Sequence, residues 1–304
     1  MPSYSGVWTL SQQFQAVGQG LWPSLTLSGD IGVFADIADT MQYITITTLG
    51  NSTNFGNLTV STSGLWQGAS SSTRGVYTTS TNAMQYITIT TQGDTQTFGQ
   101  LLVSGQAQGA TSNSTRGLFA GFFVSGANNT INYITIATTG DALDFGDLSV
   151  ARYALGLASN STRSLFAGGS VPKYNVIDYV TIASAGNATD FGDMTVARTY
   201  AGGASSSTRA IFGSGQDASA VNLNTIDYVT VASTGNAIDF GDLIVAAEGA
   251  CPVSNATRAV FSGGGNTNVI QYVTIATTGN AIDFGDFTAN ASRLGGVSNC
   301  HGGL

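Results

Sequence analysis

Pairs of aspartates recur along the sequence in the phrase DFGD, where two residues separate the two carboxylates. The pairs are Asp144 and Asp147, Asp190 and Asp193, Asp239 and Asp242, and Asp283 and Asp286. Such pairs could bind calcium, because hard cations are held by several carboxylate and carbonyl oxygens. A catalytic or metal site is normally unique in a chain, however, and this pair occurs four times. We therefore expect a structural role near a turn, with neither metal nor cofactor, in which Asp accepts backbone N–H bonds.

A thiol beside an imidazole is the other candidate for chemistry, since Cys300 precedes His301, the single histidine of the chain. Such a pair can act as nucleophile and base. Adjacent residues of a strand point to opposite faces, so these two side chains would not meet. Cys251 is the only other cysteine, which gives neither a disulfide framework nor a zinc site and leaves open whether the two are paired. We expect no enzyme activity.

The composition favours an all-β fold and excludes two classes of ligand. Only 9% of the 304 residues are charged, and the chain has 40 glycines but one lysine and one glutamate, so strong helix formers are scarce. The net charge of −8 offers no basic surface to nucleic acid or to an anionic membrane. No segment has the length of an apolar membrane span and the first residues do not resemble a secretion signal, so we expect no membrane insertion.

The elements that must position these residues form a repeat. A phrase of the type YITI or YVTI occurs six times, at spacings of 43, 47, 46, 49 and 44 residues. It begins at Tyr43, Tyr86, Tyr133, Tyr179, Tyr228 and Tyr272. Each unit contains four short β-branched or aromatic segments separated by Gly, Asn and Ser turns, a pattern typical of antiparallel strands. Four strands in about 46 residues predict the blades of a β-propeller, which stack because one sheet cannot bury both faces.

The whole chain, residues 1–304, is interpreted as one propeller domain. The repeat units are expected at approximately 20–60, 64–103, 105–150, 153–196, 200–246 and 248–289. The letters GLW at residues 20–22 recur at residues 64–66, which places the first strand of the first unit at residues 20–27.

The two ends of the chain decide the number of blades. Residues 294–299 copy the first strand of a unit, and propellers commonly complete one blade from both termini. We therefore favour a seventh, shortened blade built from residues 5–18 and 293–304. A closed ring of six blades with packed tails is the alternative.

The order of residues within a unit resembles the kelch repeat. A glycine pair, a tyrosine, an aromatic residue and an arginine follow one another in that repeat. The corresponding residues here are Gly168, Gly169, Tyr179, Phe191 and Arg198, and again Gly263, Gly264, Tyr272, Phe284 and Arg293. This resemblance implies a propeller architecture.

Two longer phrases are similar to repeats of virion structural proteins from marine tailed bacteriophages, including cyanophages. They are YVTVASTGNAIDFGDLIV at residues 228–245 and SSSTRAIFG at residues 205–213. The resemblance implies a non-enzymatic tail or capsid appendage, located in the phage particle or otherwise extracellular. Its partners would be other virion proteins or a glycan or protein of the host surface, and it could form a homo-oligomer within the virion. The alternative is a carbohydrate-binding or carbohydrate-cleaving propeller.

Strand order predicts a structural ring of arginine–aspartate pairs. If the strands of a unit run A to D, the A–B turn with Ser-Thr-Arg and the C–D turn with DFGD lie on one face. The expected pairs join Arg116, Arg163, Arg209 and Arg258 to Asp147, Asp193, Asp242 and Asp286. We expect each exposed pair to contribute no more than about 1 kcal/mol. The tyrosines and phenylalanines that recur once per unit are expected to pack between sheets.

The B–C connections differ most between units, in both length and composition. Alternation of strand direction puts them on the face opposite the predicted arginine–aspartate ring. Recognition usually resides in loops held by a rigid scaffold, although such loops also tolerate sequence drift. We therefore predict that partner contacts are made by Phe122, Phe123, Val124, Val171, Lys173 and Tyr174.

Overall fold

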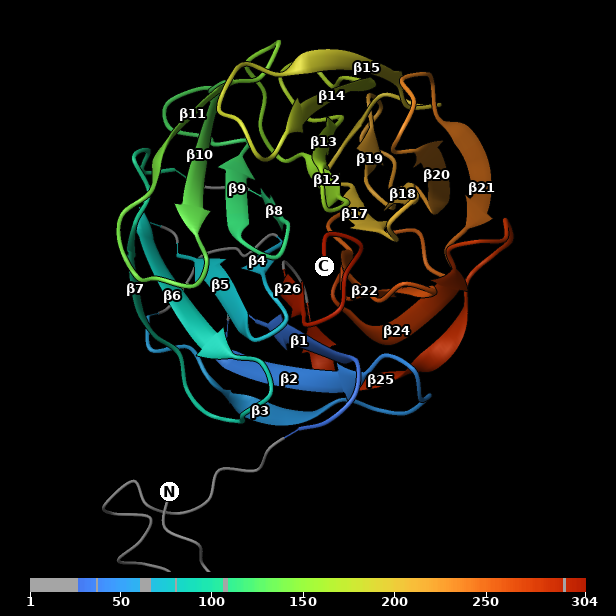
Figure 1. Ribbon diagram of the computed structural model, residues 1–304. Helices are drawn as coiled ribbons and strands as arrows, with labels where there is room; N and C mark the ends of the chain where they lie inside the picture. The colour runs from blue at the N-terminus through green and yellow to red at the C-terminus, as the bar shows by residue number, and fades with distance from the viewer. Residues whose placement is uncertain (1–26, 37, 61–66, 80, 106–108, 292–293) are drawn as a thin grey trace, which may run out of the picture.

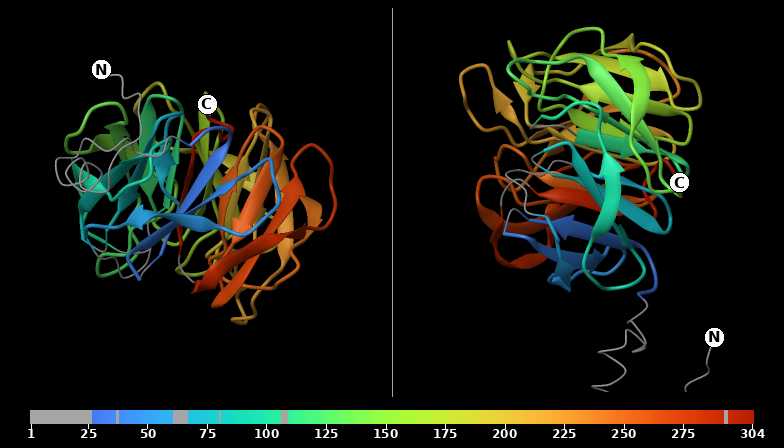
Figure 2. Two further views of the ribbon diagram at one scale, coloured as in Figure 1. Left: turned by 90° about the horizontal axis from the view of Figure 1, so that it is seen from below. Right: turned by 90° about the vertical axis from the view of Figure 1, so that its left-hand side faces the viewer.

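The computed structural model describes residues 27–36, 38–60, 67–79, 81–105, 109–291 and 294–304. Within these residues the chain is all-β, and six four-stranded antiparallel sheets stand around a central axis as the blades of a propeller (Figure 1). Side views show a thick disc with two faces (Figure 2). The predicted β-propeller is confirmed with six blades, and the favoured seventh blade is wrong.

Blades are numbered along the chain, and the strands of each are lettered A to D from the axis outward. Blade 1 contains β26 (Gly295–Ser298), β1 (Ile31–Ala35), β2 (Thr40–Thr45) and β3 (Thr53–Asn57). Blade 2 contains β4 (Ala69–Ser70), β5 (Arg74–Thr78), β6 (Ala83–Thr88) and β7 (Gln96–Gln100). Blade 3 contains β8 (Gly109–Ser112), β9 (Arg116–Ala120), β10 (Thr130–Thr135) and β11 (Leu143–Asp147).

Blades 4 to 6 follow the same pattern. Blade 4 contains β12 (Gly156–Ser159), β13 (Arg163–Ala167), β14 (Val176–Thr181) and β15 (Thr189–Asp193). Blade 5 contains β17 (Gly202–Ser205), β18 (Arg209–Gly213), β20 (Thr225–Thr230) and β21 (Ile238–Asp242). Blade 6 contains β22 (Cys251–Ser254), β23 (Arg258–Ser262), β24 (Thr267–Thr274) and β25 (Ile282–Ala291). A separate two-stranded ribbon joins β16 (Arg198–Thr199) to β19 (Gln216–Asp217).

The last strand of the chain closes blade 1. β26 is strand A of this blade and pairs antiparallel with β1. Beyond it, the side chain of Asn299 accepts the N–H of Ile31 at 2.8 Å. In blade 4 the turn residue Asn160 accepts the N–H of Arg163 at the same distance, 2.8 Å. The contacts of an A–B turn are therefore kept in blade 1 although its two strands come from opposite ends of the chain.

This closure explains why the seven-blade prediction fails. It assigned residues 294–299 to an extra blade because residues 20–27 were expected to be strand A of the first unit. The structure gives that position to β26, and only one strand of a blade can lie beside the axis. Residues 5–18, 20–26 and 293, on which the prediction also depended, lie outside the described residues.

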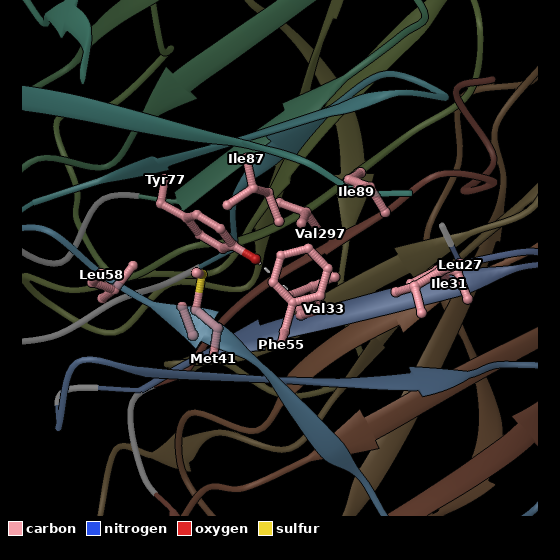
Figure 3. Close-up of a cluster of buried hydrophobic side chains, with 11 residues drawn as sticks. Leu27, Ile31, Val33, Met41, Phe55, Leu58, Tyr77, Ile87, Ile89 and Val297 are labelled. Atoms are coloured by element: carbon pink, nitrogen blue, oxygen red, sulfur yellow. Dashed lines mark hydrogen bonds between the residues drawn. The ribbon is translucent and has the colours of Figure 1, made fainter. Parts of the chain in front are cut away.

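Apolar clusters hold neighbouring blades together. Between blades 1 and 2, Phe55, Val33 and Val297 pack with Tyr77 and Ile87 (Figure 3). The buried Tyr77 hydroxyl donates to the Val33 carbonyl at 3.1 Å, so it is not left unpaired. In every blade the Tyr of strand C meets the Phe of strand D edge to face, with ring centres 5.8–6.2 Å apart. The phenylalanines are buried in the clusters between neighbouring blades, as predicted, and the tyrosines pack against these clusters while partly buried.

The outer rim of each seam repeats the same backbone contacts. The turn glycine after strand C donates its N–H to the Phe carbonyl of the preceding blade's strand D, as Gly235 does to Phe191 at 2.7 Å. The next turn residue, Asn236, accepts the N–H of Asp193 at 3.1 Å. Gly192 has a φ of +145°, and a Cβ on it would lie 2.5 Å from the Gly235 carbonyl, so a side chain does not fit. The recurring letters TGN and DFGD are therefore contacts between blades.

A ring of serines surrounds the axis. Strand A of each blade ends in a buried serine whose hydroxyl donates to the carbonyl of the corresponding serine in the preceding blade. The six residues, with O···O distances of 2.6–3.0 Å, are Ser298, Ser70, Ser112, Ser159, Ser205 and Ser254. The ring is complete only because Ser298, from the last strand, links Ser254 to Ser70.

One side chain lies at the axis near each face of the disc, His301 on one face and Gln67 on the other. On the face of the A–B turns, Nε2 of His301 lies 3.0 Å from the Ser70 carbonyl oxygen and Nδ1 accepts the Gly303 N–H at 3.0 Å. On the other face Gln67 crosses the axis, where it accepts the Leu157 N–H at 3.2 Å and donates to the Gly203 carbonyl. A cavity of about 40 Å³ lies between them. The axis of the disc therefore holds only a small cavity.

His301 is expected to make the protein less stable at mildly acidic pH. Its accepting Nδ1 and carbonyl-facing Nε2 fit the neutral ring, and burial lowers the pKa of His301 although the Ser70 carbonyl opposes the shift. Because the folded-state pKa is the lower one, the stabilisation is present above about pH 6.5 and is lost as the pH falls through the folded-state pKa.

Thermal unfolding at about pH 7.5 and about pH 5.5 measures this loss. The variant His301→Gln should show a smaller difference in Tm between the two pH values, because the chain has no other histidine. Equal differences in the variant and in the unmodified chain would contradict the assignment.

Candidate functional site

The arginines that begin strand B lie on the face of the A–B turns, but they do not meet aspartates. They are Arg74, Arg116, Arg163, Arg209 and Arg258. The guanidinium of Arg163 lies 4.7 Å from the centre of the Tyr179 ring, and its Nη1 donates to the Val231 carbonyl of the next blade at 2.9 Å. The other four make the same two contacts, at 4.3–5.0 Å and 2.8–3.1 Å. Blade 1 carries Ile31 at this position, so its seam with blade 2 has no such bridge.

The predicted arginine–aspartate ring is wrong. It assigned Arg116, Arg163, Arg209 and Arg258 to Asp147, Asp193, Asp242 and Asp286. In blade 4 Arg163 lies opposite Thr181 at the end of strand C, whereas Asp193 lies opposite Val176 at its start. Thr181 and Val176 are five residues apart along strand C, so Arg163 and Asp193 lie at positions separated by about 17 Å along this strand. Strand D starts at the C–D turn and carries its second aspartate to the level where strand C begins.

Two buried ion pairs lie between blades near that other face, and the sequence analysis missed both. Arg152 pairs with Asp178 at 3.0 Å and Arg198 with Asp227 at 2.9 Å, and all four side chains are fully buried. Burial lowers the pKa of both arginines, and the facing aspartates oppose the shift. Asp227 also accepts the N–H and hydroxyl of Thr195 at 3.1 and 2.6 Å, so it fixes the segment that leaves the preceding blade.

A comparison of the repeat units contains the signal for these pairs. The residue before the strand C tyrosine is, in blades 1 to 6, Gln42, Gln85, Asn132, Asp178, Asp227 and Gln271. Where this residue is Asp, the segment from the preceding blade carries Arg152 or Arg198. Where it is Gln271, that segment carries Ala247. Both charges are present or both are absent, as expected for a buried pair, because one charge alone would be uncompensated.

The face opposite the arginines carries the B–C loops and the linkers from strand D to the next strand A, and we call it the loop face. In the side view the loop with β19 projects from it, away from the C-terminus (Figure 2). The rings of Phe123 and Tyr153 lie 4.9 Å apart, and Tyr153 forms a β-bridge with Ser170. Lys173 donates to Gln216 at 3.0 Å. These contacts connect the loops of blades 3, 4 and 5 across two seams.

The connected surface continues toward blade 6. The linker strand β16 pairs with β19 of the next B–C loop, so linker and loop form one ribbon. Gln216 of that ribbon donates to Glu248 in the linker between blades 5 and 6, at 3.0 Å. The loops of consecutive blades are therefore fixed to one another and not only to their own sheets.

The predicted contact residues differ in exposure. The B–C loops of this surface expose Phe123 and Val124 at 42%, Val171 at 61% and Val221 at 55%, of which Val221 was not predicted. The linkers also expose Val150, Val196 and Ile244. Lys173 and Tyr174 are partly exposed. Phe122 is fully buried in the cluster between blades 2 and 3 and cannot contact a partner, which corrects that prediction. Adjacent residues of an extended segment point to opposite sides, so only one of the two phenylalanines can face solvent.

Backbone strain gathers on the loop face. Among the described residues, the non-glycine residues with positive φ, between 58° and 65°, are Asp39, Ala154, Tyr200, Ser214, Ala220 and Asn266. All of them lie in B–C loops or in linkers between blades. Each such conformation costs about 1 kcal/mol or more and persists where the surrounding structure enforces it, often at functional sites. Strain and exposed apolar side chains thus occur on the same face.

Neither cysteine is placed to act as a nucleophile. Cys251 and Cys300 are both free, and burial raises the pKa of both thiols. His301 faces the axis, where it contacts the serine ring. In the described part of the chain no group of three His, Cys, Asp or Glu side chains could hold a metal ion.

No protein-family model matches the sequence, and no curated protein matches it. No helix in the ranges that the structure describes is long and apolar enough to cross a membrane.

Proposed function

We propose that the chain is a non-enzymatic binding protein that presents the loop face of a rigid propeller to a partner. The proposal depends on one observation: the loops of blades 3, 4 and 5 form a continuous surface. Its loops are fixed to one another by the contacts of Phe123, Lys173 and Gln216, while its apolar side chains remain exposed. A surface that is already ordered loses little conformational freedom when a partner binds.

The repeat phrases support a place in the virion of a tailed phage. They are similar to repeats of phage structural proteins, and the partner would then be another virion protein or a protein of the host surface. In this proposal the six blades form a rigid scaffold, and the loop face contacts the partner.

Carbohydrate binding is the second candidate function. It is favoured by Phe123 and Tyr153, which place an aromatic pair on the loop face, where a sugar ring could stack. Cleavage is less favoured, because glycosidases need two carboxylates about 5 to 9.5 Å apart that flank the bond. The Asp217 carboxylate of this face is used within its own loop, where it accepts the N–H groups of Ser219 and Val221 at 2.9 Å each.

Binding of the labelled chain to phage particles and host cells tests the proposed function. The variant Val124→Asp/Val221→Asp should bind at least about tenfold more weakly, because it places two charges in the apolar contact. The control Leu49→Asp/Ile282→Asp alters residues 58% and 59% exposed, away from the loop face, and should bind as the unmodified chain does.

Equal binding by the two variants would contradict a role for the loop face. Glycan arrays separate the two candidates. Binding to immobilised glycans that is lost in Phe123→Ala would favour the carbohydrate function over protein recognition.

A further inference from the structure

The exposed apolar side chains of the loop face are surrounded by negative charge. The carboxylates on this face belong to Asp36, Asp39, Asp147, Asp193, Asp217, Asp242, Glu248 and Asp286. Four of them are the last residue of the DFGD phrase in strand D. Asp193, for example, lies opposite Val176, the first residue of strand C in the same blade. The others lie in B–C loops or, for Glu248, in a linker between blades. Acidic side chains therefore accompany the apolar surface around most of the disc.

Among the residues that the structure describes, positive charge on the loop face is almost entirely absent or already bound within the protein. Lys173 is its one lysine, and the ammonium is bound to Gln216 at 3.0 Å and to the Asp217 carbonyl. Arg152 and Arg198 are neutralised in their buried ion pairs. Among the described residues, eight carboxylates against one ammonium leave a side-chain charge of −7 on this face outside the two buried ion pairs, compared with −8 for the whole chain. Arg293, in the linker from β25 to β26, lies outside the described residues.

The charge distribution decides which occupant the apolar surface fits. A partner that buries Val124, Val171 and Val221 must bring its own polar rim close to these carboxylates. Like charges across an interface are strongly unfavourable, whereas a complementary rim speeds association and sets specificity. An acidic partner is therefore disfavoured, and a basic one is favoured.

A second copy of the chain is a poorer fit than a basic protein. The opposite face carries arginines that could approach the carboxylates, but their Nη1 groups are already bound to backbone carbonyls between blades. Each copy also carries a net charge of −8, so two copies repel each other.

We infer that the loop face binds a protein segment in which lysine or arginine side chains flank apolar ones. The apolar side chains of the segment pack on Phe123, Val124 and Val221, and its basic side chains approach the carboxylates at the ends of strands D. This inference rests on the proposed function and specifies the chemistry of the partner.

The test uses variants whose replacements occur naturally elsewhere in the ring. Asp193→Asn/Asp242→Asn removes two charges from the loop face, and blades 1 and 2 already carry Asn57 and Gln100 at this position. The control Asp94→Asn/Asp141→Asn removes two charges at other seams of the ring, between blades 1 and 2 and between blades 2 and 3, where the two carboxylates accept the N–H groups of Asn57 and Gln100. Four blades carry Asn at that position, so the hydrogen bond that each turn residue accepts is kept.

The probes are a fluorescent lysine–leucine peptide and a glutamate–leucine peptide of the same pattern, measured by fluorescence anisotropy with the full chain. We expect only the lysine peptide to bind, and to lose affinity at about 1 M salt, where the Debye length is about 3 Å. Asp193→Asn/Asp242→Asn should weaken its binding about fivefold, whereas the control at the seams of blades 1, 2 and 3 should change it less than twofold.

Three outcomes would overturn the inference. They are absence of lysine-peptide binding at low salt, equal binding of the glutamate peptide, and equal weakening by both double variants. Light scattering at low salt adds a fourth, because self-association that Asp193→Asn/Asp242→Asn abolishes would identify a second copy as the occupant. The proposed function is tested separately, since loss of particle binding in Val124→Asp/Val221→Asp supports it whatever the charge of the partner.

Discussion

A chain that ends at Leu294 is expected to lose its cooperative thermal unfolding transition. The deletion removes β26, which pairs with β1 and buries Val297, 2% exposed, between blades 1 and 2. Burial of one valine contributes about 1.5–3 kcal/mol, and each lost ladder hydrogen bond costs about 1 kcal/mol. The serine ring would also be opened at Ser298. The sum is comparable to the total stability of a typical domain, about 5–15 kcal/mol.

Circular dichroism during heating measures this transition. Deletion of Leu304 alone is the control and should leave the transition in place, because β26 and His301 remain. A peptide of residues 294–304 added to the shortened chain should restore the transition, with a Tm that rises with peptide concentration. An unchanged Tm in the shortened chain would show that the last strand does not hold the ring closed.

The variant Arg198→Ala is expected to lose about 3–5 kcal/mol of unfolding free energy, because it leaves the buried carboxylate of Asp227 without its partner. It also removes the guanidinium bonds to the Thr225 and Phe212 carbonyls, at 3.0 and 2.9 Å. Adding Asp227→Gln should restore at least half of the loss. The seam between blades 5 and 6 shows why, because Ala247 and Gln271 occupy the corresponding two positions there.

Urea unfolding of the single and double variants measures the two free energies. Arg163→Ala is the matched control, because this arginine is partly exposed and stacks on Tyr179 without an ion pair. It should cost about 1 kcal/mol. A double variant as unstable as Arg198→Ala alone would mean that the uncompensated charge is not the cause.

The strands and their arrangement could be predicted because the local signals agree with one another in every unit. Tyr179 and Phe191 recur at fixed distances from turn residues, and they meet edge to face in the folded blade. The blade number could not be predicted in the same way. Residues 20–27 and 294–299 were both candidates for strand A of blade 1, and only closure of the ring selects between them.

The candidate site was predicted less well, for two physical reasons. The face on which Asp193 lies depends on where strand D starts, and the sequence analysis placed DFGD in the turn when it is the strand itself. For Phe122 and Phe123, the pleat sends one ring into the core and one to solvent, but composition does not say which. The pair of Arg198 and Asp227 was recognisable only by comparing units position by position.

The uniform seams have a consequence for how such a disc can change. Gly235 and Asn236 bind the preceding blade through its main chain, and the same two bonds recur at the other seams with little dependence on the blade concerned. Each unit therefore makes these two bonds with the blade before it and accepts the same two from the blade after it. A unit moved to another position in the ring would meet the same two main-chain bonds on both sides, whereas the buried ion pairs and the arginine bridge would have to be matched to its new neighbours.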